Sequence, residues 1–249
     1  MVSIGDQVII QEFLQGTEYV VDTVSLDGDH KLTDIWRCHK GAHNGAAFVY
    51  EYFDLLDSEG DIQQILFEYA CSVLDGLEIK QGPGHSEIYI RENGQPVLVE
   101  IGSRLGGPRM PYGTSPCVAS QKAQTEYTVD AYVQPELFHD KWKDSYKKTK
   151  HSRMVFLIHT QNKLFCGLNE TIVNQIKGLT SFYHVEFAIS EGDLLKKTID
   201  VRSSPGFIYL IHNDKAQIEA DYEQIRALEA HLYQTHPMMT ALSESVVIP

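Results

Sequence analysis

The sequence lacks any apolar run that approaches the roughly 20 residues a helix needs to cross a bilayer. Its first residues, Met1 to Asp6, lack the basic start and apolar core of a secretory signal. Positive charge is also scarce, because 21 lysines and arginines face 34 aspartates and glutamates, for a formal net charge of -13. This balance argues against nucleic acid or a membrane surface as a partner, since both attract clustered Lys and Arg. We therefore expect a cytoplasmic protein.

Closely spaced cysteines are missing as well. The sequence has 4 cysteines, Cys38, Cys71, Cys117 and Cys166, and each is far along the chain from the next. This spacing shows neither a thiolate metal knuckle nor a redox pair. We expect reduced thiols that are mostly buried. With 249 residues, of which 43% are hydrophobic, the chain has room for one large or two modest domains with a packed core.

What the sequence does have is a pair of glutamates in two strand-like runs, residues 85–91 and 96–104. Asn93-Gly94 between them can take positive φ, as a tight hairpin requires. Such a hairpin makes Glu87 and Glu100 near cross-strand neighbours, with opposite residues on one face about 5 Å apart. Two carboxylates held that close repel unless a cation lies between them, and such pairs bind Mg²⁺ together with substrate phosphates. The alternative is two solvated surface glutamates.

The residues after Glu100 favour the metal hypothesis. Arg104 follows four residues later, and then comes a loop with Gly106, Gly107 and Arg109. Glycines let a backbone approach a ligand, and arginines offer forked donors to carboxylate or phosphate. His85, on the same strand face as Glu87, has two interpretations: it orients substrate, or it is a strand histidine bonded to a neighbour.

The hydrophobic pattern predicts a mixed α+β fold. Apolar residues at three-and-four spacing predict a helix from Asp61 to about Gly76. The other predicted strands are 7–14, 19–26, 31–37, 47–53, 154–158, 182–189 and 206–211, the other helices are 116–133, 170–177 and 215–233, and 40–46 is expected to be a loop. Polar residues from Phe138 to Arg153 mark the best boundary. We divide the chain into residues 1–140 and, as linker and accessory domain, residues 141–249.

The segment Gln11-Glu-Phe-Leu-Gln-Gly-Thr-Glu18 resembles the hinge of ATP-grasp carboxylate–amine ligases, which has the form Glu-x-x-Leu-x-Gly-x-Glu. The resemblance implies that the backbones of Glu12 and Leu14 bind adenine, that Gln11 faces its amino group, and that Glu18 binds the ribose. Gln11 departs from the usual glutamate but keeps an acceptor oxygen. Because a ribose contact is normally exposed, we expect Glu18→Ala to weaken ATP binding without unfolding the protein.

The second motif of that family is an acid on one strand followed by Glu-x-Asn-x-Arg on the next. Here Glu87 is followed by Glu100-Ile-Gly-Ser-Arg104. The resemblance implies that Glu87 and Glu100 bind Mg²⁺ and that Arg104 is the catalytic arginine, which stabilises the transferred phosphoryl group. Gly102 stands where the family has asparagine, which puts a second metal ion in doubt. Lys31, Arg37 and Lys40 are the cations that could reach phosphate from the floor of the site.

The resemblance is to the C-terminal half of an L-amino-acid ligase: an ATP-grasp C-terminal subdomain, with an antiparallel sheet and helices, plus a small α+β accessory domain. It implies an ATP- and Mg²⁺-dependent ligase that joins small carboxylate and amine substrates through an acyl-phosphate. The alternative is a non-catalytic nucleotide-binding remnant or assembly partner. The family's lid and Rossmann-like domain precede the hinge, so we expect this chain alone not to catalyse ligation. A separate N-terminal half and a second copy of this chain are the two candidates for completing the site.

Overall fold

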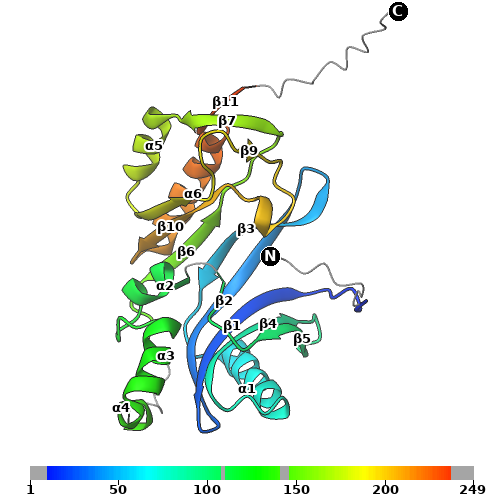
Figure 1. Ribbon diagram of the computed structural model, residues 1–249, viewed down its shortest axis with the longest axis vertical. Coiled ribbons are helices and arrows are strands. Elements are labelled where there is room, and N and C mark those ends of the chain that lie inside the picture. The colour runs from blue at the N-terminus through cyan, green and yellow to red at the C-terminus, as the bar shows by residue number, and fades with distance from the viewer. Residues whose placement is uncertain (1–9, 108–109, 141–145, 237–249) are drawn as a thin grey trace, which may run out of the picture.

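The computed structural model describes residues 10–107, 110–140 and 146–236. Its main element is an eight-stranded sheet whose strands run in the spatial order β5-β4-β1-β2-β3-β6-β10-β8 (Figure 1). The strands of this sheet are β1 (Thr17–Leu26), β2 (Asp29–His43), β3 (Ala46–Leu55), β4 (Gly82–Ile90), β5 (Pro96–Gly102), β6 (His151–Phe156), β8 (Phe182–Phe187) and β10 (Gly206–His212). All the neighbouring strands in it pair antiparallel.

Two tight turns of the predicted kind order the first three strands. Asp27 and Gly28 have φ of 54° and 90°, and they join β1 to β2 as a two-residue hairpin. Asn44 and Gly45, with φ of 58° and 88°, join β2 to β3 in the same way. This makes β2 fifteen residues long, with both of its neighbours adjacent in sequence. The Asp27-Gly28 turn thus joins the two predicted strands 19–26 and 31–37 as an antiparallel pair.

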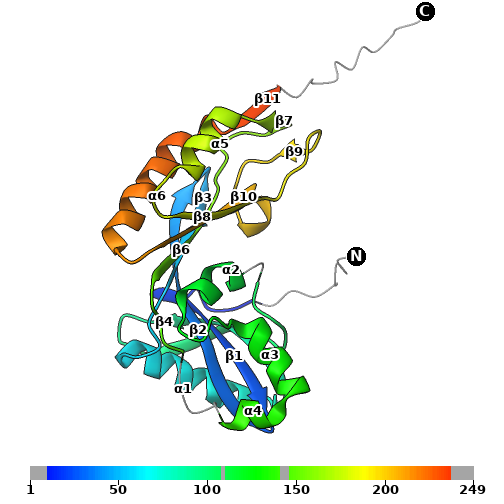
Figure 2. The same ribbon diagram turned by 90° about the vertical axis from the view of Figure 1, so that its left-hand side faces the viewer.

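Helices cover both faces of β1 and β2. The helix α1 (Asp61–Gly76) follows the predicted bounds and buries Leu66 and Ala70 against Tyr19, Val21 and Ile35. On the opposite face lie α2 (Met110–Thr114), the 3₁₀ turn η1 (Ser115–Cys117), α3 (Gln124–Val133) and α4 (Pro135–Asp140). Figure 2 shows α1 and α3 on opposite sides of the sheet. Because of this double cover, β1 is buried along nearly its whole length.

The second half of the chain extends the same sheet. Strand β6 pairs with β3 through Tyr52↔Val155 and Phe53↔Met154, so the sheet continues across residue 140. The helices α5 (Glu170–Lys177) and α6 (Lys215–Glu229) pack on β6, β8 and β10. A three-stranded sheet of β7 (Lys163–Leu168), β9 (Leu194–Leu195) and β11 (Tyr233–His236) lies at the far end, next to the 3₁₀ turn η2 (Val201–Ser203). The domain boundary at residue 140 stays a prediction.

Four local predictions were wrong. The helix expected over residues 215–233 ends at Glu229, and Tyr233 begins β11. Residues 7–9 of the expected first strand lie outside the described residues, and residues 10–15 form no strand, with Ile10 and Phe13 exposed. The segment 40–46 is strand as far as His43, because the turn is placed at Asn44-Gly45 and not earlier. The helix expected over residues 116–133 begins only at Gln124, after η1 and an extended stretch around Val118.

The mixed α+β class, with a mainly antiparallel sheet and helices on both faces, is confirmed. All four cysteines are free, and only Cys38 and Cys117 are buried, so the expectation of mostly buried thiols holds for half of them. In the part of the chain that the structure describes, no helix is both long and apolar enough to span a membrane.

Candidate nucleotide and metal site

Glu87 and Glu100 lie directly opposite one another in the β4–β5 hairpin, which confirms that they are cross-strand neighbours. A bulge follows Glu87, so the register of the hairpin changes there. The side chain of Glu87 is 26% exposed, whereas that of Glu100 is 59% exposed and faces solvent more freely. Two carboxylates are therefore adjacent at a point of the sheet that solvent can reach.

The donor set suits Mg²⁺ held jointly by protein and phosphate. Mg²⁺ commonly takes one or two carboxylates and fills its other positions with phosphate oxygens and water. Among the described residues, no group of three or more His, Cys, Asp and Glu side chains is arranged to hold a metal ion by itself. Two opposed carboxylates therefore fit an ion that arrives with a nucleotide better than a closed protein site.

A cavity of about 420 Å³ beside this hairpin is lined by all four residues expected to bind the nucleotide and by Glu87. Those four are Gln11, Glu12, Leu14 and Glu18. Glu100 and Arg104 do not line it. The segment 10–15, which takes no regular structure, forms one wall, and Val97 to Val99 of β5 form another. The structure thus brings the hinge-like segment and one metal-ligand candidate together around one space.

Glu18 is the centre of a polar network at the base of this cavity. Its carboxylate pairs with the ammonium group of Lys40 on β2 and accepts a hydrogen bond of 2.6 Å from the Tyr50 hydroxyl on β3. Glu18 is only 4% exposed, so the expectation of an exposed side chain is wrong, while the expected effect of Glu18→Ala stays a prediction. The reason is that Glu18 lies on β1, a strand in the interior of the sheet, where it pairs with Tyr89 of β4 and needs polar partners.

Lys40 and Tyr50 both keep their protons in this network. Burial alone would lower the pKa of Lys40, but the neighbouring Glu18 carboxylate outweighs it and the pKa is raised. Burial, followed by the charge of Glu18, raises the pKa of Tyr50 far above its ordinary value, so its hydroxyl stays protonated and donates. Tyr89 on β4 completes the group, with its hydroxyl 3.5 Å from Lys40 Nζ. A bound polyol or phosphate would therefore meet one carboxylate, one ammonium and two phenols.

The hinge-like segment is tied to the hairpin by two side-chain contacts. Gln11 Nε2 donates to the Val99 carbonyl at 3.3 Å, and Arg91 pairs with Glu12 at 2.7 Å. Gly16, between this segment and β1, has φ of 140°. A Cβ at Gly16 would lie 2.1 Å from the Ile90 carbonyl oxygen, so only glycine fits between the segment and β4. These contacts hold the segment along the β4–β5 edge of the sheet.

His85 connects the candidate metal site with the sheet interior. Its Nδ1 lies 2.7 Å from Asp22 Oδ1, and its Nε2 lies 3.8 Å from Glu87 Oε1. Burial opposes protonation of His85, but the hydrogen bonds and charges of Asp22 and Glu87 raise its pKa to about 10. The imidazolium therefore lies between two carboxylates. Both interpretations of His85 offered by the sequence stay compatible with this placement, because it is bonded to a neighbour and also adjoins Glu87.

Arg104 lies next to the glutamate pair. Its Nη2 is 3.8 Å from Glu100 Oε1, and its Nη1 donates to the Leu105 carbonyl at 3.0 Å. A Cβ at Gly102 would lie 3.1 Å from two Arg104 side-chain atoms, so glycine leaves room for this arginine to fold back. Arg104 is half-exposed and able to swing toward an anion on the hairpin.

Two of the three cations expected at the floor of the site lie together in the structure. Lys40 lines the nucleotide cavity, and it also lines an adjoining cavity together with Arg37. Lys31 instead lies 5.0 Å over the ring of Tyr127 on α3, near the Asp27-Gly28 turn.

Two tyrosines that the sequence motifs do not single out, Tyr50 and Tyr89, also line the nucleotide cavity. Strand alternation could have found Tyr89, because it shares a strand face with Glu87 two residues away. Tyr50 lies on β3, which no local signal places beside Glu18, since β2 separates β3 from β1 in the sheet. The motifs therefore predict the acidic residues of the site but not the phenols around them.

Comparison with known proteins places these motifs in a family. Residues 1–111 match the model of the ATP-grasp domain. The chain is 29% identical over 232 residues to dapdiamide A synthase of Enterobacter agglomerans, covering 91% of this chain and 52% of that protein. It is 30% identical over 99 residues to the L-arginine-specific L-amino acid ligase of Bacillus subtilis, covering 40% of this chain and 24% of that protein.

Solved structures agree on the fold. An L-amino acid ligase from Bacillus licheniformis superimposes with a TM-score of 0.73 at 19% identity, covering 90% of this chain and 53% of that one. A phosphoribosylglycinamide synthetase from Anaerococcus prevotii gives 0.67 at 13% identity, with 90% and 55% covered. This chain therefore spans about half the length of the relatives it matches.

Proposed function

We propose that this chain is part of an ATP-grasp ligase, because its residues 1–111 match the ATP-grasp domain, and that it serves ATP- and Mg²⁺-dependent ligation of a carboxylate to an amine through an acyl-phosphate. The observation that carries the proposal is the cavity lined jointly by Gln11, Glu12, Leu14, Glu18 and Glu87. Because the matched relatives are about twice as long, ligation is proposed for the complete protein and nucleotide binding for this chain. Similarity to an L-amino acid ligase favours an amino acid as one substrate.

In the proposed complex the adenine lies against the segment 11–14. This segment belongs to no strand, so its backbone N–H and C=O groups can form hydrogen bonds with the edge of the adenine. The ribose hydroxyls donate to Glu18, whose carboxylate is already held by Lys40 and Tyr50. A ribose that bonds Glu18 must share it with these two residues. Lys40 then stabilises the complex through its charge, which persists at neutral pH because its pKa is raised.

Glu87 and Glu100 would hold Mg²⁺ against the phosphates, where the ion supplies charge neutralisation for phosphoryl transfer. The substrate carboxylate attacks the γ-phosphorus, ADP leaves, and the amine then attacks the acyl-phosphate with release of inorganic phosphate. Arg104 would stabilise the negative charge that develops on the phosphoryl oxygens, since its planar fork can bond two of them. His85 keeps Glu87 oriented from the side of the sheet.

The test is calorimetric titration of this chain with a non-hydrolysable ATP analogue, with and without Mg²⁺. We expect Mg²⁺ to strengthen binding at least about tenfold, and we expect Glu87→Gln and Glu100→Gln to remove most of that gain. Glu92→Gln, which removes an exposed charge from the turn of the same hairpin, is the matched control. If neither Mg²⁺ nor the two substitutions changes the affinity for the ATP analogue, the metal assignment is excluded. Binding without any ADP or amide formation in the complete protein would favour a non-catalytic nucleotide-binding module.

A further inference from the structure

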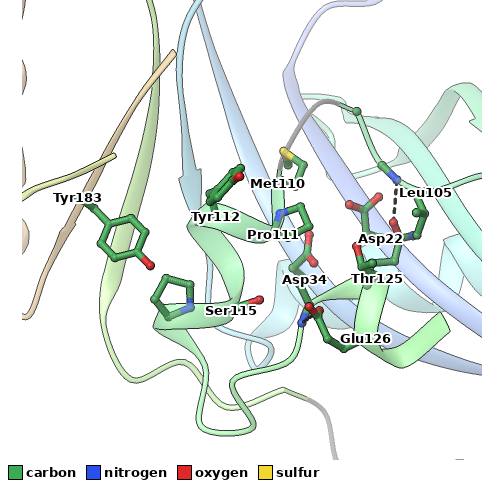
Figure 3. Close-up of a pocket in the computed structure, with 15 residues that line it drawn as sticks. Asp22, Asp34, Leu105, Met110, Pro111, Tyr112, Ser115, Thr125, Glu126 and Tyr183 are labelled. Atoms are coloured by element: carbon green, nitrogen blue, oxygen red, sulfur yellow. Dashed lines mark hydrogen bonds between the residues drawn. The ribbon is translucent and has the colours of Figure 1, made fainter. Parts of the chain in front are cut away.

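A second cavity, of about 480 Å³, lies on the face of the sheet covered by α2 and α3. Asp22 of β1 and Asp34 of β2 line one part of it, and Tyr112 and Tyr183 line another. Figure 3 shows the two tyrosines well separated from Asp22, with Met110 and Pro111 between them. The volume suits a small molecule such as an amino acid. The cavity therefore has an acidic end, an apolar middle and an aromatic end.

The acidic end consists of two buried carboxyl groups on opposite positions of one strand pair. Asp22 and Asp34 are partners in the β1–β2 register, so their side chains project from the same face. They are 0% and 1% exposed. Asp22 Oδ1 is engaged by His85 Nδ1 at 2.7 Å, and Asp34 Oδ1 accepts a bond of 2.9 Å from Trp36 Nε1.

The second carboxyl oxygen of each aspartate, Oδ2, differs from the first in its hydrogen bonding. Within the described residues, neither Asp22 Oδ2 nor Asp34 Oδ2 has a hydrogen-bond partner, although both atoms are buried. A buried acceptor left without a donor is costly, and two neighbouring carboxylates add repulsion. Burial, and then the adjacent charge of Asp22, raises the pKa of Asp34 well above its ordinary value. The pair therefore holds a proton when the cavity is empty, and no neighbouring residue outside the pair donates to either Oδ2 atom among the described residues.

The backbone of the glycine loop lies close to the pair. A Cβ at Gly106 would lie 2.5 Å from Asp22 Oδ2, so only glycine fits beside this carboxylate without displacing it. The Gly106 amide donates to Gln124 Oε1 at 2.7 Å, and the same side chain donates to the carbonyls of Thr23 and Gly84 at 3.0 Å each. Gln124 therefore fixes the loop beside the acid pair.

We propose that this cavity binds the basic side chain of an amino-acid substrate, an ammonium or guanidinium group on an aliphatic stem, with the Asp22–Asp34 pair as its receptor. The cation supplies the donors that the two Oδ2 atoms lack, while Leu105, Met110 and Pro111 pack on the stem. The proposal rests on the proposed ligase function. It names the class of one substrate, and His85 links its receptor to Glu87 at the phosphate site.

The test compares two matched pairs of probes by calorimetry: L-lysine with L-norleucine, and L-arginine with L-citrulline. We expect each basic probe to bind the wild-type chain at least about tenfold more tightly than its neutral counterpart, as one buried charge-assisted contact would give. In Asp34→Asn the preference should fall below about threefold, and Gly106→Ala should reduce it by filling the space beside Asp22. Glu223→Gln, an exposed acid on α6, is the control for loss of charge alone.

Asp34→Asn also separates a binding role from a structural one. The amide group introduced by this substitution can donate to Asp22 Oδ2 while its oxygen keeps the Trp36 bond, so the free variant should unfold at the wild-type temperature or above it. A purely structural aspartate would give a less stable variant with no change in probe preference. Equal binding of lysine and norleucine by wild type, or a preference unchanged by Asp34→Asn, overturns the proposal. Either result leaves the nucleotide test above unaffected, so the two can fail independently.

Discussion

Tyr50 on β3 donates a hydrogen bond of 2.6 Å to Glu18 on β1, reaching across β2, whose Lys40 pairs with the same carboxylate. Three adjacent strands are thereby joined on the floor of the nucleotide cavity. In this arrangement Glu18 has two roles: it is the buried ion-pair partner of Lys40, and it is a candidate ribose ligand. Changes at Glu18 should therefore affect both stability and binding.

We expect Glu18→Gln to lower the free energy of unfolding by about 2 to 3 kcal/mol, because it leaves the Lys40 ammonium group without its carboxylate in a largely buried place. The measurement is urea unfolding at pH 7 of Glu18→Gln, Lys40→Met and the double variant. The double variant should be closer to wild type than the sum of the two single costs. Additive costs would mean that Glu18 and Lys40 do not stabilise one another.

The sequence predicts this site better than its surroundings. The Asn93-Gly94 turn brings Glu87 and Glu100 near one another, and the bulge next to Glu87, which the sequence does not reveal, sets them directly opposite. The helix at residues 61–76 is equally visible from its periodicity. Such local signals specify elements that depend mostly on neighbours in sequence.

Long-range burial is what the sequence does not reveal. Strand β1 is buried on both faces, so alternation gives no indication that Asp22 faces a cavity and that its partner Asp34 lies beside it. Residues 10–15 have the apolar pattern of a strand but run beside the β4–β5 edge without pairing. The helix after residue 116 starts late because Val118 forms a bridge with Lys148, a contact between residues far apart in sequence.

Gly16 should tolerate no side chain. We expect Gly16→Ala to cost about 3 kcal/mol or more, because φ of 140° is strained for any L-residue and the new Cβ would overlap the Ile90 carbonyl oxygen. Gly28→Ala is the matched control: its φ of 90° is also unfavourable, yet no atom lies within 4 Å of the added Cβ. It should cost about 1 to 2 kcal/mol from backbone strain alone. Thermal unfolding of both variants provides the comparison, and equal losses would contradict the steric argument.

His85 should make the metal-free protein less stable as pH rises. Its pKa is about 10 in the folded chain against 6.5 for an ordinary histidine, despite the opposing effect of burial, because Asp22 and Glu87 favour the charged form. The folded state thus binds the proton more tightly, so the contribution of His85 is complete below pH 6.5 and is lost as pH approaches 10. Between these limits this group alone can lower the free energy of unfolding by at most about 1.4 kcal/mol per pH unit.

The measurement is urea unfolding from pH 6 to 9 for wild type, for His85→Gln, and for His231→Gln as an exposed-histidine control. The wild-type and His231→Gln curves should fall together with pH, while the His85→Gln curve should be flatter. Imidazole ¹⁵N shifts of wild type at pH 8 give a second readout that needs no variant, and they should show His85 doubly protonated. A neutral His85 at pH 8 would mean that the two carboxylates do not outweigh burial, and Glu87 would then lack a cationic neighbour on the side of Asp22.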